Sequence, residues 1–186
     1  LDKDFADAYW NKSLSVLQSG NMQDGWPLYE WRKRKPGPHG IRDLSEPEWT
    51  GAENVAGRTV FLHWEQGLGD MVQFARFVPA LARLDGKVLF EAPPRIQALL
   101  RSVPGMPPIV SPNTVPNADL VCPMMSIPAR TGVPVGMAEP YLRADPDRVA
   151  RWRDRIGGSG FKIGIACQGN PNRIEDRGRS MPLTCF

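Results

Sequence analysis

One segment constrains the fold of this chain more than any other: an apolar run that leads into a glycine-rich loop and then into a helical pattern. Residues 59–64 read Thr-Val-Phe-Leu-His-Trp, and residues 65–70 read Glu-Gln-Gly-Leu-Gly-Asp. β-Branched and aromatic residues predict a strand, and the glycines predict a tight turn. Apolar residues at helical spacing over 71–84 predict a helix. A strand followed by a crossover helix is the building unit of parallel α/β sheets.

The alternation of strand and helix continues along the chain. Further strands are predicted at 87–90, 108–110 and 118–122, with a helix at 94–103. Asp145 and Pro146 are typical of a helix start, and this helix is expected to reach Ile156. One more strand is predicted at 161–166. The predicted fold class is therefore α/β, with a Rossmann-like parallel sheet. Within that sheet, Cys122 and His63 are expected to be core residues, with the polar groups of His63 satisfied.

Two helices are predicted before the sheet. Apolar and small residues at helical spacing run from Phe5 to Leu17, and a second helix continues through Trp26 to Trp31. Their spacing resembles one tetratricopeptide repeat, whose 34-residue period fits the span from 2 to 35. The residues that carry this likeness are Tyr9, Ser13, Val16, Gly20, Asn21, Gly25 and Tyr29. The basic run 32–35 is expected to be the solvated end of the second helix.

The large apolar residues of this hairpin predict that it packs against something else. Phe5, Trp10, Trp26 and Trp31 are too many for two short helices to bury between themselves. We expect them to cover the Rossmann-like part. The alternative is a repeat supplied by another chain, which would make a symmetric homodimer.

These patterns divide the chain into four parts. Residues 1–36 form the tetratricopeptide-like hairpin, and 37–58, rich in proline and glycine, form a linker that Trp49 pins to a neighbour. Residues 59–158 form the Rossmann-like domain. Residues 159–186 are expected to begin a second Rossmann-like domain that this chain contains only in part.

Composition excludes several functional classes. A net charge of +3 with one dense basic run argues against nucleic acid as a partner. The chain has neither an apolar stretch of about 18 residues nor a signal-like N-terminus, so we expect no membrane span and a cytoplasmic location. Three cysteines without a C-x-x-C pair, and two histidines, predict no metal site.

The loop 65–70 follows the first strand, where open α/β sheets bind ligands. A dinucleotide fingerprint would need a third glycine, but Val72 stands there. Glu91 does lie about 20 residues on, where a ribose-binding acid is expected, so a dinucleotide site with Gly67, Gly69 and Glu91 remains an alternative. The purely structural interpretation is a tight turn in which Asp70 is the N-cap of the helix.

Several stretches of the chain, in order, resemble one family. Residues 25–32, 65–70, 73–76 and 169–171, continued by Arg179-Ser180, are similar to bacterial proteins that join tetratricopeptide repeats to a heptosyltransferase-like or O-linked-GlcNAc-transferase-like glycosyltransferase region. The likeness implies a GT-B architecture, in which two Rossmann-like domains face each other across a cleft. The first would bind the acceptor and the second most of the nucleotide-sugar donor. Cys167 departs from the family, which has tryptophan there.

The resemblance also implies a function and a set of site residues. It implies sugar transfer from a nucleotide sugar to an acceptor hydroxyl, without metal or cofactor, with a peptide or protein presented by the repeat-like helices. With only one complete domain, the chain alone is expected to be inactive. Asp70 would be the general base, the acceptor loop would contain Glu65, Gln66, Gly67, Gly69 and Gln73, and the donor phosphates would contact Gly169, Asn170, Arg179 and Ser180.

Two other interpretations of these segments stay open. The loop after 168 can instead be a solvated one whose arginines pair with Glu175 and Asp176. The chain as a whole can instead be a non-catalytic protein-interaction module, in which the Rossmann-like part is only a scaffold.

Overall fold

The structure is a computed structural model, and it describes residues 4–35, 42, 44–112, 117–132, 139–170, 176 and 178–186. The chain forms two compact units, residues 1–146 and residues 147–186. Part of the predicted linker, 37–41 and 43, lies outside the described residues, as do Pro36 and Glu175.

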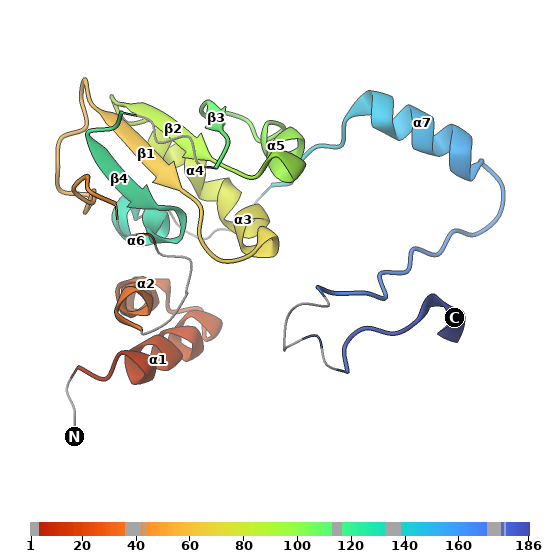
Figure 1. The fold of residues 1–186 in the computed structure, drawn as a ribbon, viewed down its shortest axis with the longest axis horizontal. Helices are drawn as coiled ribbons and strands as arrows, with labels where there is room; N and C mark the ends of the chain where they lie inside the picture. Colours follow the sequence, from red (N-terminus) through yellow and green to blue (C-terminus); the bar gives the residue numbers. More distant parts are fainter. Residues whose placement is uncertain are drawn as a thin grey trace. The chain divides into compact units, whose positions relative to one another are not determined.

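The first unit is built around a four-stranded parallel sheet (Figure 1). Its strands are β1 (Thr59–His63), β2 (Lys87–Glu91), β3 (Ile109–Val110) and β4 (Leu120–Pro123), in the lateral order β3-β2-β1-β4. Val60 of β1 pairs with Val88 on one side and with Leu120 on the other. The chain thus moves outward from β1 to β3 and then returns to the opposite side of β1. The predicted α/β class is confirmed.

Short helices connect the strands. The connection from β1 to β2 contains α3 (Leu68–Phe74), the 3₁₀ turn η2 (Ala75–Phe77) and α4 (Val78–Ala82), while α5 (Pro94–Leu100) follows β2. The prediction of one helix over 71–84 is wrong, because Pro79 has no N–H and its ring crowds the carbonyl four residues earlier, where the α-helix is interrupted. The turn η3 (Met124–Ser126) and α6 (Ile127–Thr131), after β4, were not predicted, since five residues are too short for a helical period.

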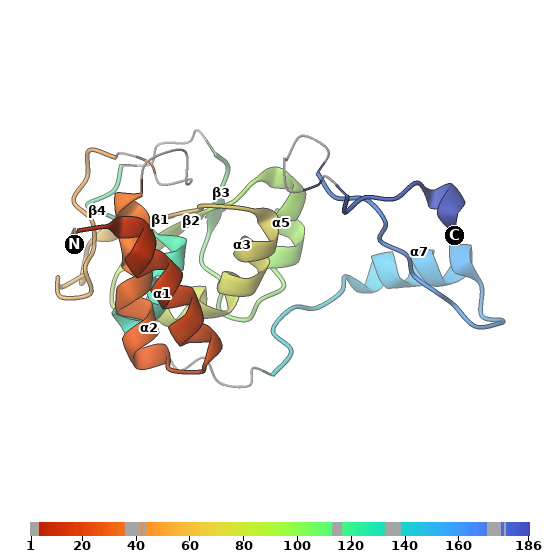
Figure 2. The ribbon, with the colours of Figure 1, turned by 90° about the horizontal axis from the view of Figure 1, so that it is seen from below.

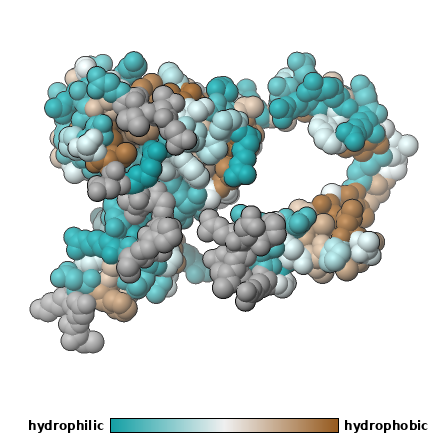
Figure 3. Space-filling model, in the orientation of Figure 1, coloured by the Kyte–Doolittle hydropathy of each residue, from teal (hydrophilic) through white to brown (hydrophobic). Residues whose placement is uncertain are grey.

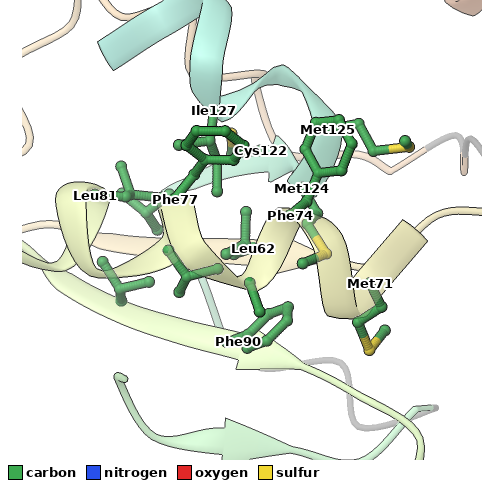
Figure 4. Close-up of a cluster of buried hydrophobic side chains, with 14 of the residues drawn as sticks. Leu62, Met71, Phe74, Phe77, Leu81, Phe90, Cys122, Met124, Met125 and Ile127 are labelled. Carbon is green, nitrogen blue, oxygen red and sulfur yellow. The ribbon is translucent and has the colours of Figure 1, made fainter. Parts of the chain in front are cut away.

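The core lies between the sheet and these helices (Figure 4). Val60 and Leu62 belong to it, whereas Phe61 and His63 alternate to the opposite face of β1. Burial raises the pKa of the Cys122 thiol to about 12, as expected for a cysteine that acts as a core residue. The labelled members of the core are Leu62, Met71, Phe74, Phe77, Leu81, Phe90, Cys122, Met124, Met125 and Ile127.

The helical hairpin consists of α1 (Ala6–Gln18) and α2 (Met22–Tyr29), and the 3₁₀ turn η1 (Glu30–Arg34) follows it. The side chain of Asn21 caps α2 by accepting a hydrogen bond from the Asp24 amide at 3.2 Å. A Cβ on Gly25 would lie 2.5 Å from a methyl carbon of Leu17, so the close approach of the two helices requires glycine there. The two predicted helices are confirmed.

The hairpin packs on the α/β part of the first unit, and α2 lies against α6 (Figure 2). The ring of Trp26 meets the rings of Phe74 and Phe77 edge to face, at centroid distances of 5.8 and 6.4 Å. The predicted packing is therefore confirmed for Trp26. It is wrong for Phe5, which remains 54% exposed. As predicted, Trp49 pins the end of the linker, since its amide donates to the carbonyl of Val121 at 2.7 Å.

The helix α7 (Pro146–Ile156) begins at the predicted proline, the last residue of the first unit, and its other residues belong to the second unit. The prediction of a strand at 161–166 is wrong, because these residues are described and form no strand. Phe161 is 92% exposed, and an apolar stretch follows α7 in Figure 3. A strand exists through hydrogen bonds to a neighbouring strand, and the described part of this unit provides none.

Candidate functional site

The loop 65–70 leaves the carboxyl end of β1 on the side of the sheet where the strand order reverses between β1 and β4. In open α/β sheets, the connections diverge at such a point and leave a crevice in which ligands bind. The loop suggested by the sequence thus occupies the place that the fold class favours for a site.

Glu65 is turned into the protein at this point. It is 1% exposed, and its carboxylate accepts two hydrogen bonds from the guanidinium of Arg32, from Nη2 at 2.7 Å and from Nε at 3.1 Å. The backbone amide of Met125 donates to the same carboxylate at 3.0 Å. Two parallel N–H···O bonds between charged groups form one of the strongest side-chain contacts in proteins. Glu65 therefore anchors the loop.

Arg32 is the partner that sequence reasoning missed. The prediction that the basic run is solvated is wrong for this residue, which is 2% exposed. Its guanidinium also donates to Glu30 Oε1 at 2.7 Å and to Ser126 Oγ at 2.9 Å. Burial alone would lower the pKa of Arg32, but Glu65 and Glu30 raise that pKa above its ordinary value. Arg32 thus links the segment after β1, through Glu65, to the segment after β4, through Ser126.

The buried charges extend outward from Arg32 in a balanced network. Ser126 donates to Glu30 at 2.8 Å, and Arg130 donates to Glu30 at 3.0 Å. Burial alone would raise the pKa of Glu30, but Arg32 and Lys33 lower it to about 2. The network contains three cations and three carboxylates, namely Arg32, Lys33, Arg130, Glu30, Glu48 and Glu65.

The next loop residue, Gln66, is also held by the hairpin. Its backbone has a φ of 62°, in the left-handed region that residues other than glycine rarely adopt. Its amide Nε2 donates to the hydroxyl of Tyr29 at 3.2 Å, and that hydroxyl contacts the sulfur of Met125 at 3.8 Å. Burial raises the pKa of Tyr29, so this hydroxyl remains protonated.

Asp70 occupies the third position of α3, and Gly67 is the N-cap. The expectation that Asp70 itself caps the helix is therefore wrong. Its Oδ2 accepts a hydrogen bond from the Gly67 amide at 2.9 Å, which is one half of a capping box, since glycine has no side chain to complete it. Within the described residues, Oδ1 has no recorded partner. A Cβ on Gly69 would meet nothing within 4 Å, and Gly69 and Gln73 are exposed.

Glu91 ends β2, where the dinucleotide interpretation expects a ribose-binding acid. It is fully buried, and Arg42 donates to both of its oxygens, at 3.1 and 2.7 Å. Burial raises the pKa of Glu91, and Arg42 offsets this only in part. Because Glu91 is fully buried and paired with Arg42, a ribose hydroxyl could reach its carboxylate only if the surrounding side chains moved.

His63 lies at the end of β1, on the face of the strand that points away from the core. It is buried as predicted, but the expectation that its polar groups are satisfied is wrong, because Nδ1 has no hydrogen-bond partner among the described residues. Burial lowers the pKa of His63 to about 4, so the ring is neutral at pH 7.

The expected donor residues lie in the second unit, where three of them come together. The hydroxyl of Ser180 accepts from the Gly169 amide at 2.7 Å and donates to Asp176 at 2.8 Å. A Cβ on Gly169 would lie 3.1 Å from the Arg179 guanidinium and 2.2 Å from the Asp176 carboxylate, so a larger residue here would displace the Asp176 side chain. Asn170 follows Gly169 directly in the chain.

Within the described residues, no group of His, Cys, Asp or Glu side chains could hold a metal ion. Over the same residues, no helix has both the length and the apolar character needed to cross a membrane. Comparisons of the chain with protein-family models, with curated proteins and with solved structures found no match.

Proposed function

We propose that this chain forms the acceptor side, and the beginning of the donor side, of a metal-independent GT-B glycosyltransferase that moves a sugar from a nucleotide sugar to an acceptor hydroxyl. The observation that carries the proposal is the position of the loop 65–70 at the carboxyl end of β1, where the strand order reverses. A half-buried carboxylate, Asp70, lies beside an open glycine there.

In this proposal Asp70 is the general base. The Gly67 amide holds Oδ2, and Oδ1 takes the proton from the acceptor hydroxyl. The acceptor oxygen then forms a bond to the anomeric carbon, while the bond from that carbon to the nucleoside diphosphate breaks. The diphosphate leaves with the electron pair.

On the donor side, the guanidinium of Arg179 and the hydroxyl of Ser180 stabilise the charge of the leaving diphosphate. In the structure, Asp176 accepts a hydrogen bond from the Ser180 hydroxyl. A phosphate oxygen has the same acceptor chemistry and would replace this carboxylate when the donor binds.

One observation favours a second candidate, a non-catalytic interaction module. The buried pair of Arg32 and Glu65 ties the segments after β1 and β4 together, which is compatible with a purely structural role for this part of the chain. The dinucleotide alternative is weaker, because Glu91 is fully buried and paired with Arg42.

The test is release of nucleoside diphosphate by the full-length natural protein from uridine, guanosine and adenosine diphosphate sugars, with peptides and sugars as acceptors. Turnover that Asp70→Asn abolishes would support the enzyme. Absence of turnover with every donor, together with capture of a peptide by the hairpin, would favour the module.

A further inference from the structure

Two residues of the helical hairpin contact two successive residues of the site loop. Tyr29 and Arg32 are three positions apart, at the junction of α2 and η1, and therefore lie on one side of the helical segment. Tyr29 accepts from Gln66, and Arg32 donates to Glu65.

The Arg32 contact is fully desolvated. Both side chains of the Arg32–Glu65 pair are at most 2% exposed, and the guanidinium also reaches Ser126 on the other side of the crevice. A buried guanidinium with several fixed partners has one orientation, so the position of Glu65 is set by the hairpin.

The Tyr29 contact acts on a strained residue. Gln66 has a φ of 62°, and such a conformation persists where the surroundings impose it. Gln66 immediately precedes Gly67, whose amide holds Oδ2 of Asp70. The backbone at Gln66 therefore sets the direction of the amide that orients Asp70.

We infer that the hairpin is an integral part of the acceptor site, in which Tyr29 and Arg32 are positioning residues that fix Gln66 and Glu65 and, through the Gly67 amide, the carboxylate of Asp70. The link to activity rests on the proposed function, while the link to loop order does not. Neither residue touches the acceptor.

The experiment measures hydrogen exchange of the loop amides in the full-length protein. Tyr29→Phe removes only the hydroxyl, and Gln66→Met removes the amide donor at similar length. We expect each single variant to increase the exchange rate of the Gly67 and Met71 amides at least about fivefold, with the β1 and β2 amides unchanged. The double variant should exchange no faster than Tyr29→Phe alone, because that change already removes the hydrogen bond between Gln66 and Tyr29.

Matched controls come from the same hairpin. Tyr9→Phe removes a hydroxyl from a ring that stacks on Trp31, and Arg34→Ala removes an exposed cation from the same basic run as Arg32. Both should leave loop exchange at the wild-type rate. Loop amides that exchange at the wild-type rate in Tyr29→Phe, or single effects that multiply in the double variant, would overturn the inference.

Kinetics then separate the inference from the proposed function. If the protein transfers sugar, Tyr29→Phe should raise KM for the acceptor and lower kcat, while KM for the donor stays unchanged; an equal change in both KM values would overturn the positioning role. If no donor is turned over, the proposed function fails, and the exchange rates still decide whether the hairpin orders the loop.

Discussion

Arg32 and Glu65 are 33 positions apart in the chain and form a bidentate ion pair in the interior of the first unit. The pair joins a helical hairpin to the loop that leaves the central strand of a parallel sheet. Neither charge reaches solvent, so each depends on the other for its solvation.

Removal of one partner should therefore be costly. Arg32→Met leaves the Glu65 carboxylate buried without its cation, and we expect a loss of about 3–5 kcal/mol in the free energy of unfolding of the first unit. Arg32→Met combined with Glu65→Gln should lose less than the single variant, since glutamine can still accept from the Met125 amide without carrying a charge. Urea unfolding followed by tryptophan fluorescence measures both. A cost below about 1 kcal/mol for Arg32→Met would mean that the pair is solvated in solution.

Acid should destabilise the fold through His63. Burial lowers its pKa from 6.5 to about 4, so between these values the unfolded state binds a proton that the folded state does not. The free energy of unfolding is unaffected by His63 above pH 6.5. It falls as the pH drops from 6.5 to about 4, by about 3 kcal/mol in all. His63→Gln, which does not titrate, should remove this fall.

A second acid-sensitive step belongs to Glu30, whose pKa is lowered to about 2. The contribution of Glu30 to the free energy of unfolding is present above about pH 4.5 and is lost as the pH falls towards 2. This pH range lies below the range in which His63 acts. Unfolding free energies measured from pH 8 to pH 2 show both steps. A curve for His63→Gln that matches wild type between pH 6.5 and 4 would contradict the assignment to this histidine.

Two substitutions of Asp70 should distinguish its role in helix stability from its proposed role in catalysis. Asparagine at position 70 keeps an oxygen for the Gly67 amide but cannot take a proton, so Asp70→Asn should retain the melting temperature and lower turnover at least about a hundredfold. Asp70→Ala should be equally inactive and less stable by about 1 kcal/mol. Turnover and thermal melting of the full-length protein are the measurements. Near-normal turnover in Asp70→Asn would leave Asp70 with a structural role alone.

The second unit offers a test based on glycine. Gly169→Ala places a Cβ 2.2 Å from the Asp176 carboxylate, so this carboxylate, which accepts a hydrogen bond from Ser180, must move, and nucleotide-sugar affinity should fall at least about tenfold. Gly164→Ala is the control, because a Cβ there meets nothing within 4 Å. Titration calorimetry with the full-length protein compares the two. Equal affinities would remove this loop from the donor site.

Local chemistry was enough to predict the elements that depend on nearby residues. The β-branched run at 59–63 becomes β1, a glycine-rich turn follows it, and Pro146 begins α7, because strand propensity, turn geometry and helix starts are decided within a few residues. The start of α3 at Leu68 lies three residues before the predicted one. The interruption of the α-helix at 75–77 is also caused by a nearby residue, Pro79, although the helical spacing of the apolar residues predicted one continuous helix.

The environment of each charged residue was decided by tertiary structure. Arg32 and Arg34 belong to one basic run, yet Arg32 has 2% of its side chain exposed and Arg34 has 65%. A signal for Arg32 existed in its spacing of three from the aromatic Tyr29, but its acidic partner lies on a distant segment. Spacing along the chain carries no information about a partner that only folding brings within reach.

The sequence by itself thus determined the parallel α/β class and the place of the loop 65–70 at the end of a strand, because both follow from periodicity and turn residues. Tertiary structure alone decided that Glu65 anchors this loop to the hairpin, that Nδ1 of His63 lacks a partner among the described residues and that residues 161–166 do not form a strand. The reason is physical: ion pairs, burial and strand pairing depend on groups that are distant in sequence, and their free energies exist only once those groups meet.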